Sequence, residues 1–65
     1  MKENTIVTLR ELVKEFLNMD MPKIISTNER QMFVKALNYM VEIRKLPNSY
    51  KYLYLGKKES IKWLN

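Results

Sequence analysis

Neither cysteine nor histidine occurs in this chain of 65 residues, so no covalent cross-link can support the fold. Disulfide bonds are impossible, and a structural zinc site with Cys or His ligands is excluded. A chain of this length folds as one domain, residues 1–65, and buries only about 60% of the surface that its unfolded form exposes. Self-association is the remaining way to enlarge the core, and the hydrophobic content of 46% makes a homodimer a reasonable expectation.

The first helix is predicted from its start. The segment 8–11, Thr-Leu-Arg-Glu, matches the capping box, in which the threonine and the glutamate each accept a backbone N–H of the other. Apolar residues then recur at the spacing of one helix face: Leu9, Leu12, Val13, Phe16 and Leu17. We therefore predict a helix over residues 9–18, which ends before Pro22 because proline disfavours helical geometry in the residue that precedes it.

A second capping box, Ser26 to Glu29, predicts a longer helix over residues 27–46, with Pro47 just beyond it. The polar residues of this segment form only a narrow stripe: Asn28, Gln31, Lys35, Asn38, Glu42 and Lys45. Most of the helix surface therefore needs burial. The C-terminal segment or a second subunit has to cover it.

The last third of the chain predicts a β-hairpin. Pro47, Asn48 and Ser49 are turn residues, and tyrosine alternates along residues 50–55 as in a strand. The only glycine, Gly56, and Lys57 fit a two-residue turn, which gives strands 50–55 and 58–63. A short closing helix over residues 58–64 is the alternative. Residues 5–7 predict a further short strand that pairs with the hairpin edge or across a dimer.

The predicted fold class is therefore α+β: a short N-terminal strand, helices over 9–18 and 27–46, and the C-terminal hairpin. An all-α domain of three or four helices is the alternative. In the hairpin register one face carries Tyr50, Tyr52, Tyr54, Ile61 and Trp63. This face fits either half of a core or a base-stacking platform, and the core is favoured because the second helix needs a cover. The loop 19–25, rich in Met and Ile, either roofs that core or forms an exposed apolar patch.

The net charge of +5 lies entirely in residues 43–65. Residues 1–42 hold six bases and six acids, whereas residues 43–65 hold six bases and Glu59 alone. Those six bases are the candidate nucleic-acid-binding residues: Arg44, Lys45, Lys51, Lys57, Lys58 and Lys62. Positive charge interleaved with aromatic rings suits nucleic acid, and we expect duplex DNA. The alternative is that these lysines only solvate and protect a hairpin edge.

Two arrangements resemble known DNA-binding classes. A hairpin that projects lysines resembles in outline the wing of winged-helix proteins, which lies along DNA phosphates. A short strand followed by two helices resembles the ribbon–helix–helix class, whose members dimerise and read the major groove with paired strands. In that second arrangement Lys2, Asn4 and Thr8 would project toward DNA, and so would Ile6.

The sequence predicts neither an enzyme nor a cofactor. Its carboxylates are scattered, and no glycine-rich loop is present to hold a phosphate. The alternative function is a small effector of the kind that phages and mobile elements encode, which binds a larger host protein through an apolar, Met-rich surface. No apolar run approaches the roughly 20 residues of a transmembrane helix. We expect a cytoplasmic regulatory protein.

Overall fold

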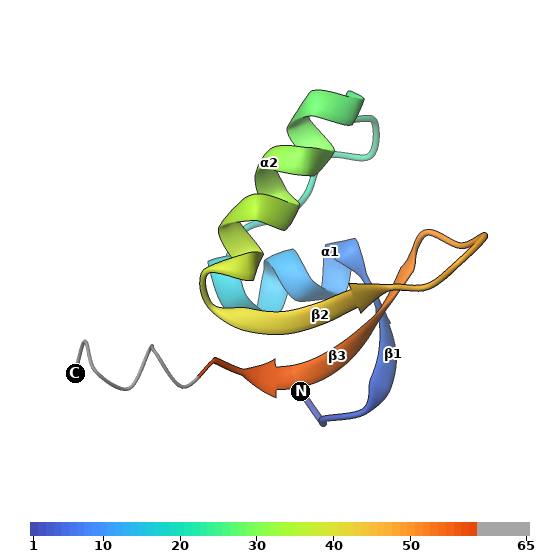
Figure 1. Ribbon diagram of the computed structural model, residues 1–65. Coiled ribbons are helices and arrows are strands. Elements are labelled where there is room, and N and C mark those ends of the chain that lie inside the picture. Colours follow the sequence, from blue (N-terminus) through green and yellow to red (C-terminus); the bar gives the residue numbers. More distant parts are fainter. Residues whose placement is uncertain (59–65) are drawn as a thin grey trace.

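The chain folds into two helical segments and a three-stranded antiparallel sheet in the computed structural model, which describes residues 1–58 (Figure 1). The elements follow in the order β1 (Thr5–Thr8), α1 (Leu9–Leu12), the π-helical turn η1 (Val13–Leu17), α2 (Thr27–Asn38), β2 (Val41–Lys45) and β3 (Lys51–Lys57). The predicted α+β class, with a C-terminal hairpin, is confirmed.

Both helices begin where the capping boxes predict. The Thr8 hydroxyl accepts the Glu11 N–H at 3.1 Å, and the Glu11 carboxylate accepts the Thr8 N–H at 2.9 Å. Ser26 and Glu29 exchange the same two bonds at 3.1 and 2.9 Å. Because each carboxylate accepts backbone and hydroxyl donors, these bonds lower the pKa of Glu11 and of Glu29. The first helix ends at Asn18, which adopts a left-handed conformation (φ 54°) that asparagine tolerates well.

The sheet has the strand order β1–β3–β2, with β3 in the centre. The N-terminal strand predicted over residues 5–7 exists, and it pairs with β3 of the same chain from Thr5↔Tyr54 to Thr8↔Lys51. β2 pairs with the other edge of β3, and its register shifts between Glu42 and Ile43. The N-terminus and the C-terminal third, which lie far apart in the sequence, are therefore joined in one sheet.

The prediction of a helix to residue 46 was wrong, because α2 ends at Asn38 and residues 41–45 form β2. The backbone N–H groups of Tyr39 and Met40 still bond to the last turn, at 3.2 and 2.9 Å, before the chain turns into the strand. Val41 and Ile43 are β-branched and lie on the same side of the strand, toward the core. Val41 also follows Leu37 by four residues and Ile43 follows Met40 by three, so a continuing helix fits as well, and pairing with β3 decides between the two.

The hairpin is also displaced from its predicted position. Its strands are β2 and β3, and the turn residues Pro47–Ser49 connect them, with Asn48 in a left-handed conformation (φ 55°). The predicted turn at Gly56 and Lys57 was wrong, since both residues belong to β3. Lys58 follows β3 and donates its N–H to the Met40 carbonyl at 3.0 Å. The rest of the second predicted strand, from residue 59, lies outside the described residues.

Gly56 is in β3 with φ at 126°, a conformation that residues with a Cβ rarely adopt. An added Cβ would lie 3.0 Å from Glu3 Oε2, but that atom ends a flexible side chain that can move away. Gly56→Ala is therefore expected to cost about 1–3 kcal/mol of unfolding free energy through backbone strain. Urea denaturation measures it, with the exposed neighbour change Lys57→Ala as the control. Equal midpoints for the two variants would show that β3 relaxes without strain.

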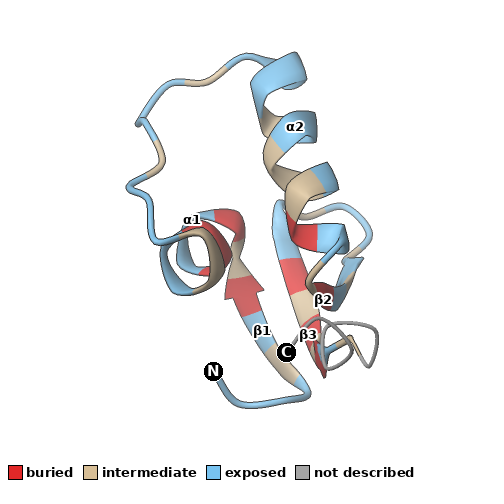
Figure 2. Ribbon diagram, turned by 90° about the vertical axis from the view of Figure 1, so that its left-hand side faces the viewer, coloured by how far each residue is buried: buried red, intermediate tan, exposed pale blue. Residues whose placement is uncertain are grey.

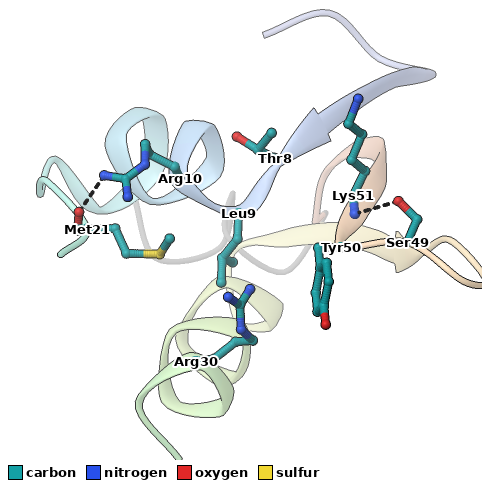
Figure 3. A pocket seen from close by; sticks show the side chains of 8 residues that line it. All are labelled: Thr8, Leu9, Arg10, Met21, Arg30, Ser49, Tyr50 and Lys51. Atoms are coloured by element: carbon teal, nitrogen blue, oxygen red, sulfur yellow. Dashed lines mark hydrogen bonds between the residues drawn. The ribbon is translucent and has the colours of Figure 1, made fainter. Parts of the chain in front are cut away.

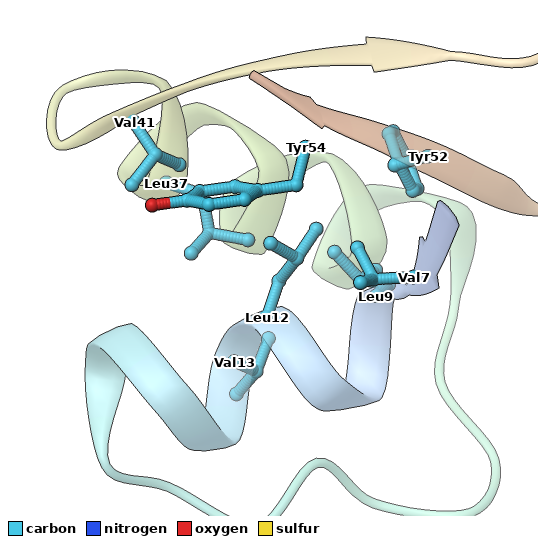
Figure 4. Packing of buried hydrophobic residues seen from close by; sticks show 8 residues of the cluster. All are labelled: Val7, Leu9, Leu12, Val13, Leu37, Val41, Tyr52 and Tyr54. Carbon is cyan, nitrogen blue, oxygen red and sulfur yellow. The ribbon is translucent and has the colours of Figure 1, made fainter. Parts of the chain in front are cut away.

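The core lies between the helices and one face of the sheet (Figures 1 and 2). Its buried members are Val7, Leu9, Leu12, Val13, Leu37, Val41, Tyr52 and Tyr54 (Figure 4). The Phe16 ring stacks on Tyr54 with centroids 5.5 Å apart, and burial raises the pKa of the Tyr54 hydroxyl. Two of the three alternating tyrosines thus serve the core, as predicted, whereas Tyr50 is 77% exposed.

Candidate nucleic-acid interface

The bases predicted to bind nucleic acid do not form one cluster. Lys51 and Lys57 stand at opposite ends of β3, and six residue steps of about 3.3 Å separate them by roughly 20 Å. Lys57 borders a depression together with Glu15, Phe16 and Met40, and Lys58 follows it. Lys62 lies outside the described residues. The predicted set therefore divides between the two ends of the hairpin.

Arg44 and Lys45 are neighbours on β2 rather than at the end of a helix. Successive strand residues point to opposite faces of a sheet, so the two side chains project in different directions. The Lys45 ammonium donates to the Ser49 carbonyl at 2.6 Å and to the Leu46 carbonyl at 3.3 Å. Lys45 thereby fastens the turn that connects β2 to β3, and its charge stays at this end of the hairpin.

A pocket of about 530 Å³ opens where the start of α1, the start of α2 and the hairpin turn meet (Figure 3). Three cations and one exposed aromatic ring are among the residues that line it: Thr8, Leu9, Arg10, Met21, Arg30, Ser49, Tyr50 and Lys51. None of the acidic residues in 1–58 lines it. We call it the Tyr50 pocket.

A second depression adjoins the Tyr50 pocket, because Arg30 borders both. It lies along α2 and is lined by Thr27, Arg30, Gln31, Val34, Lys35, Asn38, Lys45 and Tyr52, with no acid from the described part of the chain among them. The five cations that line the two depressions are what we call the basic face: Arg10, Arg30, Lys35, Lys45 and Lys51. Lys45 pairs with Tyr52, so its side chain and that of Lys51 leave the sheet on opposite sides. Lys45 and Lys51 belong to the predicted set, and the structure adds the other three.

Among residues 1–58 none of the cations of the basic face forms an ion pair with a carboxylate. The two ion pairs of this part of the chain lie elsewhere, between Lys14 and Asp20 at 3.4 Å and between the N-terminal amine and Glu15 at 3.8 Å. A cation without a carboxylate partner is available to a phosphate. Arg10 also borders a further depression that is lined by Glu11, Glu15 and Asp20.

Local contacts hold two of these side chains in place. The Arg10 guanidinium donates to the carbonyls of Met21 and of Pro22, the latter at 3.3 Å, so it is anchored to the loop after the first helix. The Arg30 guanidinium lies 5.5 Å from the centre of the Tyr50 ring, within the range of a cation–π contact. Both arginines keep further N–H donors for a ligand, since a guanidinium has five.

Glu11 is the acid that most affects the Tyr50 pocket, although it does not line it. Hydrogen bonds from the Thr8 backbone and hydroxyl lower the pKa of Glu11 most, and the Lys51 charge adds a smaller effect. The carboxylate is thus ionised at neutral pH and engaged in the cap of α1. It reduces, without cancelling, the positive potential near Lys51.

The sequence holds a signal for two of the three missed cations, Arg30 and Lys35. Thr27, Arg30, Gln31, Val34, Lys35 and Asn38 follow one another at spacings of three and one, so they share one stripe of α2. No acidic residue falls on this stripe. The net charge of residues 1–42 is zero and does not reveal this stripe, because the acids that balance its cations lie on other surfaces.

An apolar groove occupies another surface, between the end of the first helix and α2. It is lined by Leu17, Met19, Glu29, Met32, Phe33 and Ala36. Met32 is 70% exposed and Met19 is 50% exposed. In the neighbouring loop Met21 packs against the core, whereas Ile24 is 92% exposed. The loop 19–25 therefore roofs the core only in part.

The structure departs from the ribbon–helix–helix class, whereas it retains the projecting hairpin for which the sequence resembles winged-helix proteins. β1 pairs with β3 of its own chain, and a hairpin follows the second helix, so the order of elements departs from a ribbon–helix–helix. A projecting turn does exist, but over residues 46–50 rather than 56–57 (Figure 1). It carries Tyr50 and is flanked by Lys45 and Lys51.

Comparison of the sequence with known protein families and curated proteins, and of the structure with solved structures, finds no significant match. Within residues 1–58 no helix has the length and hydropathy needed to cross a bilayer. The same residues bring together no group of three acidic side chains suited to a metal ion.

Proposed function

We propose that this protein is a small non-enzymatic regulatory protein that binds nucleic acid through the basic face. The observation that carries the proposal is the grouping of Arg10, Arg30, Lys35, Lys45 and Lys51 around two adjoining depressions, neither of which is lined by an acid of residues 1–58. Phosphates are the ligands that such a surface attracts, since each bound phosphate releases condensed counterions. The exposed Tyr50 ring beside Arg30 adds a face on which a base can stack.

The structure also suggests which predicted bases matter most to this function. Lys45 and Lys51 lie beside the new cations, whereas Lys57 and Lys58 lie at the other end of β3. We assign the main phosphate contacts to the first group. Arg44, Lys57 and Lys58 would contact only a ligand that extends along the hairpin.

Binding of this kind is expected to depend steeply on salt. If three of the five cations contact phosphates, the slope of log K against log salt is about −2.1 for a single strand and about −2.7 for a duplex. A rise from 50 to 200 mM salt then weakens binding roughly 20- to 40-fold. Fluorescence anisotropy with labelled 30-base oligonucleotides, single-stranded and duplex, measures this. Absence of binding to either oligonucleotide at 50 mM salt and micromolar protein would remove the proposal.

The apolar groove favours a second candidate function, attachment to a larger protein. Met19 and Met32 expose flexible, polarisable side chains beside Phe33, and such surfaces adapt to partner proteins. This is the effector function expected as the alternative from the sequence. A chain that retains no nucleic acid at low salt, yet captures a host protein only while Met32 is intact, would establish it instead.

A further inference from the structure

We propose that the Tyr50 pocket accepts one unpaired nucleotide, so that the protein prefers a single strand to the duplex expected from the sequence. This inference rests on the proposed nucleic-acid function and specifies its ligand. In it the base stacks on Tyr50, and the adjoining phosphate lies beside Arg30 (Figure 3).

The size of the pocket fits that ligand. About 530 Å³ is available, which falls within the range of pockets that hold small molecules of nucleotide size. The pocket is formed by side chains from three separate segments, β1 with α1, α2, and the hairpin turn. A paired base inside a duplex cannot turn its face to such a pocket without leaving the stack.

The residues that line the pocket can contact both the base and the phosphate of a nucleotide. Leu9, Met21 and the Tyr50 ring supply apolar surface for a base. Tyr50 stays 77% exposed although Arg30 lies over its ring, so ring surface remains for stacking. Because Arg30 is beside this ring, its charge also reaches a phosphate that follows the stacked base.

The phosphate side of the pocket is arranged before a ligand arrives. Arg10 is held by two loop carbonyls, which reduces the side-chain entropy that it loses on binding. The Ser49 hydroxyl accepts the Lys51 N–H at 3.0 Å, and among residues 1–58 its own proton has no acceptor. A phosphate oxygen can take that proton while Arg30, beside the Tyr50 ring, provides charge.

The test compares a labelled 12-base thymidine strand with a duplex of the same number of phosphates, using wild type, Tyr50→Ala, Tyr50→Phe and Tyr39→Ala. Tyr39 is the matched control because it is 71% exposed and lines neither depression of the basic face. Stacking on an aromatic ring contributes about 1–3 kcal/mol per base. Tyr50→Ala is therefore expected to weaken single-strand binding about tenfold or more. Tyr50→Phe and Tyr39→Ala should stay within about twofold of wild type.

The possible results of this test distinguish failure of the nucleotide site from failure of the proposed nucleic-acid function. Preference for the single strand that disappears in Tyr50→Ala supports the pocket as a nucleotide site. Equal binding of both oligonucleotides, unaffected by Tyr50→Ala, overturns the pocket while leaving the basic face as a nucleic-acid surface. No binding of either oligonucleotide by wild type overturns both. A thermal melt of Tyr50→Ala that matches wild type excludes unfolding as the cause of a loss.

Discussion

Leu37→Ala is expected to lower the free energy of unfolding by about 2–5 kcal/mol, the usual cost of truncating a buried leucine. Leu37 has no exposed surface, and it lies where α2 meets the first helix and the sheet (Figure 4). Truncation leaves a cavity, because the first helix, α2 and the sheet cannot move close enough together to fill it. A domain of this size has a margin of only about 3–5 kcal/mol, so much of the variant should be unfolded at 37 °C.

Urea denaturation followed by circular dichroism measures this loss. Met32→Ala is the control, because Met32 lies on the same helix but is 70% exposed. That change should alter stability by no more than about 0.5 kcal/mol. A Leu37→Ala protein as stable as the Met32→Ala protein would mean that α2 does not pack as described.

Arg30→Glu is expected to weaken nucleic-acid binding roughly tenfold to hundredfold at 50 mM salt. Arg30 borders both depressions of the basic face, so reversing its charge removes one phosphate contact and repels the next. Folding should be unaffected. Residue 30 lies in the first turn of α2, where a negative charge is favourable to the helix dipole.

Lys2→Glu is the matched control for Arg30→Glu, since it changes the net charge equally but lines none of the described depressions of the basic face. Anisotropy titrations of the two variants, with thermal melts, make the comparison. If Lys2→Glu weakens binding as much, the effect reflects net charge rather than the basic face. If Lys57→Glu combined with Lys58→Glu has the larger effect, the interface lies at the other end of β3.

The starts of the helices were predictable because the determining contacts are local. In each capping box the hydroxyl and the carboxylate lie three residues apart, and both bonds form within one turn. The turn at Pro47–Ser49 was likewise predictable from the residues themselves. Alternation of Tyr52 and Tyr54 correctly indicated a strand with one buried face.

The extent of α2 and the place of the hairpin were not predictable in this way. The apolar residues from Val41 to Ile43 fit a continuing helix and a strand equally, and only hydrogen bonds to β3 favour the strand. Gly56 is a turn residue by composition, yet β3 continues through it because residues on β2 pair with it. Long-range pairing overrides local preference in both cases.

The sequence by itself determined a single small domain without covalent cross-links, two capped helices, and an excess of positive charge with aromatic residues near the C-terminus. The tertiary structure alone decided which cations share a surface. Arg10, Arg30 and Lys51 lie far apart in the chain and meet only when β1 pairs with β3 and the helices cover one face of the sheet. The net charge of a sequence is a sum over all surfaces of the protein, whereas a ligand contacts one surface. Folding decides which charges lie together on that surface.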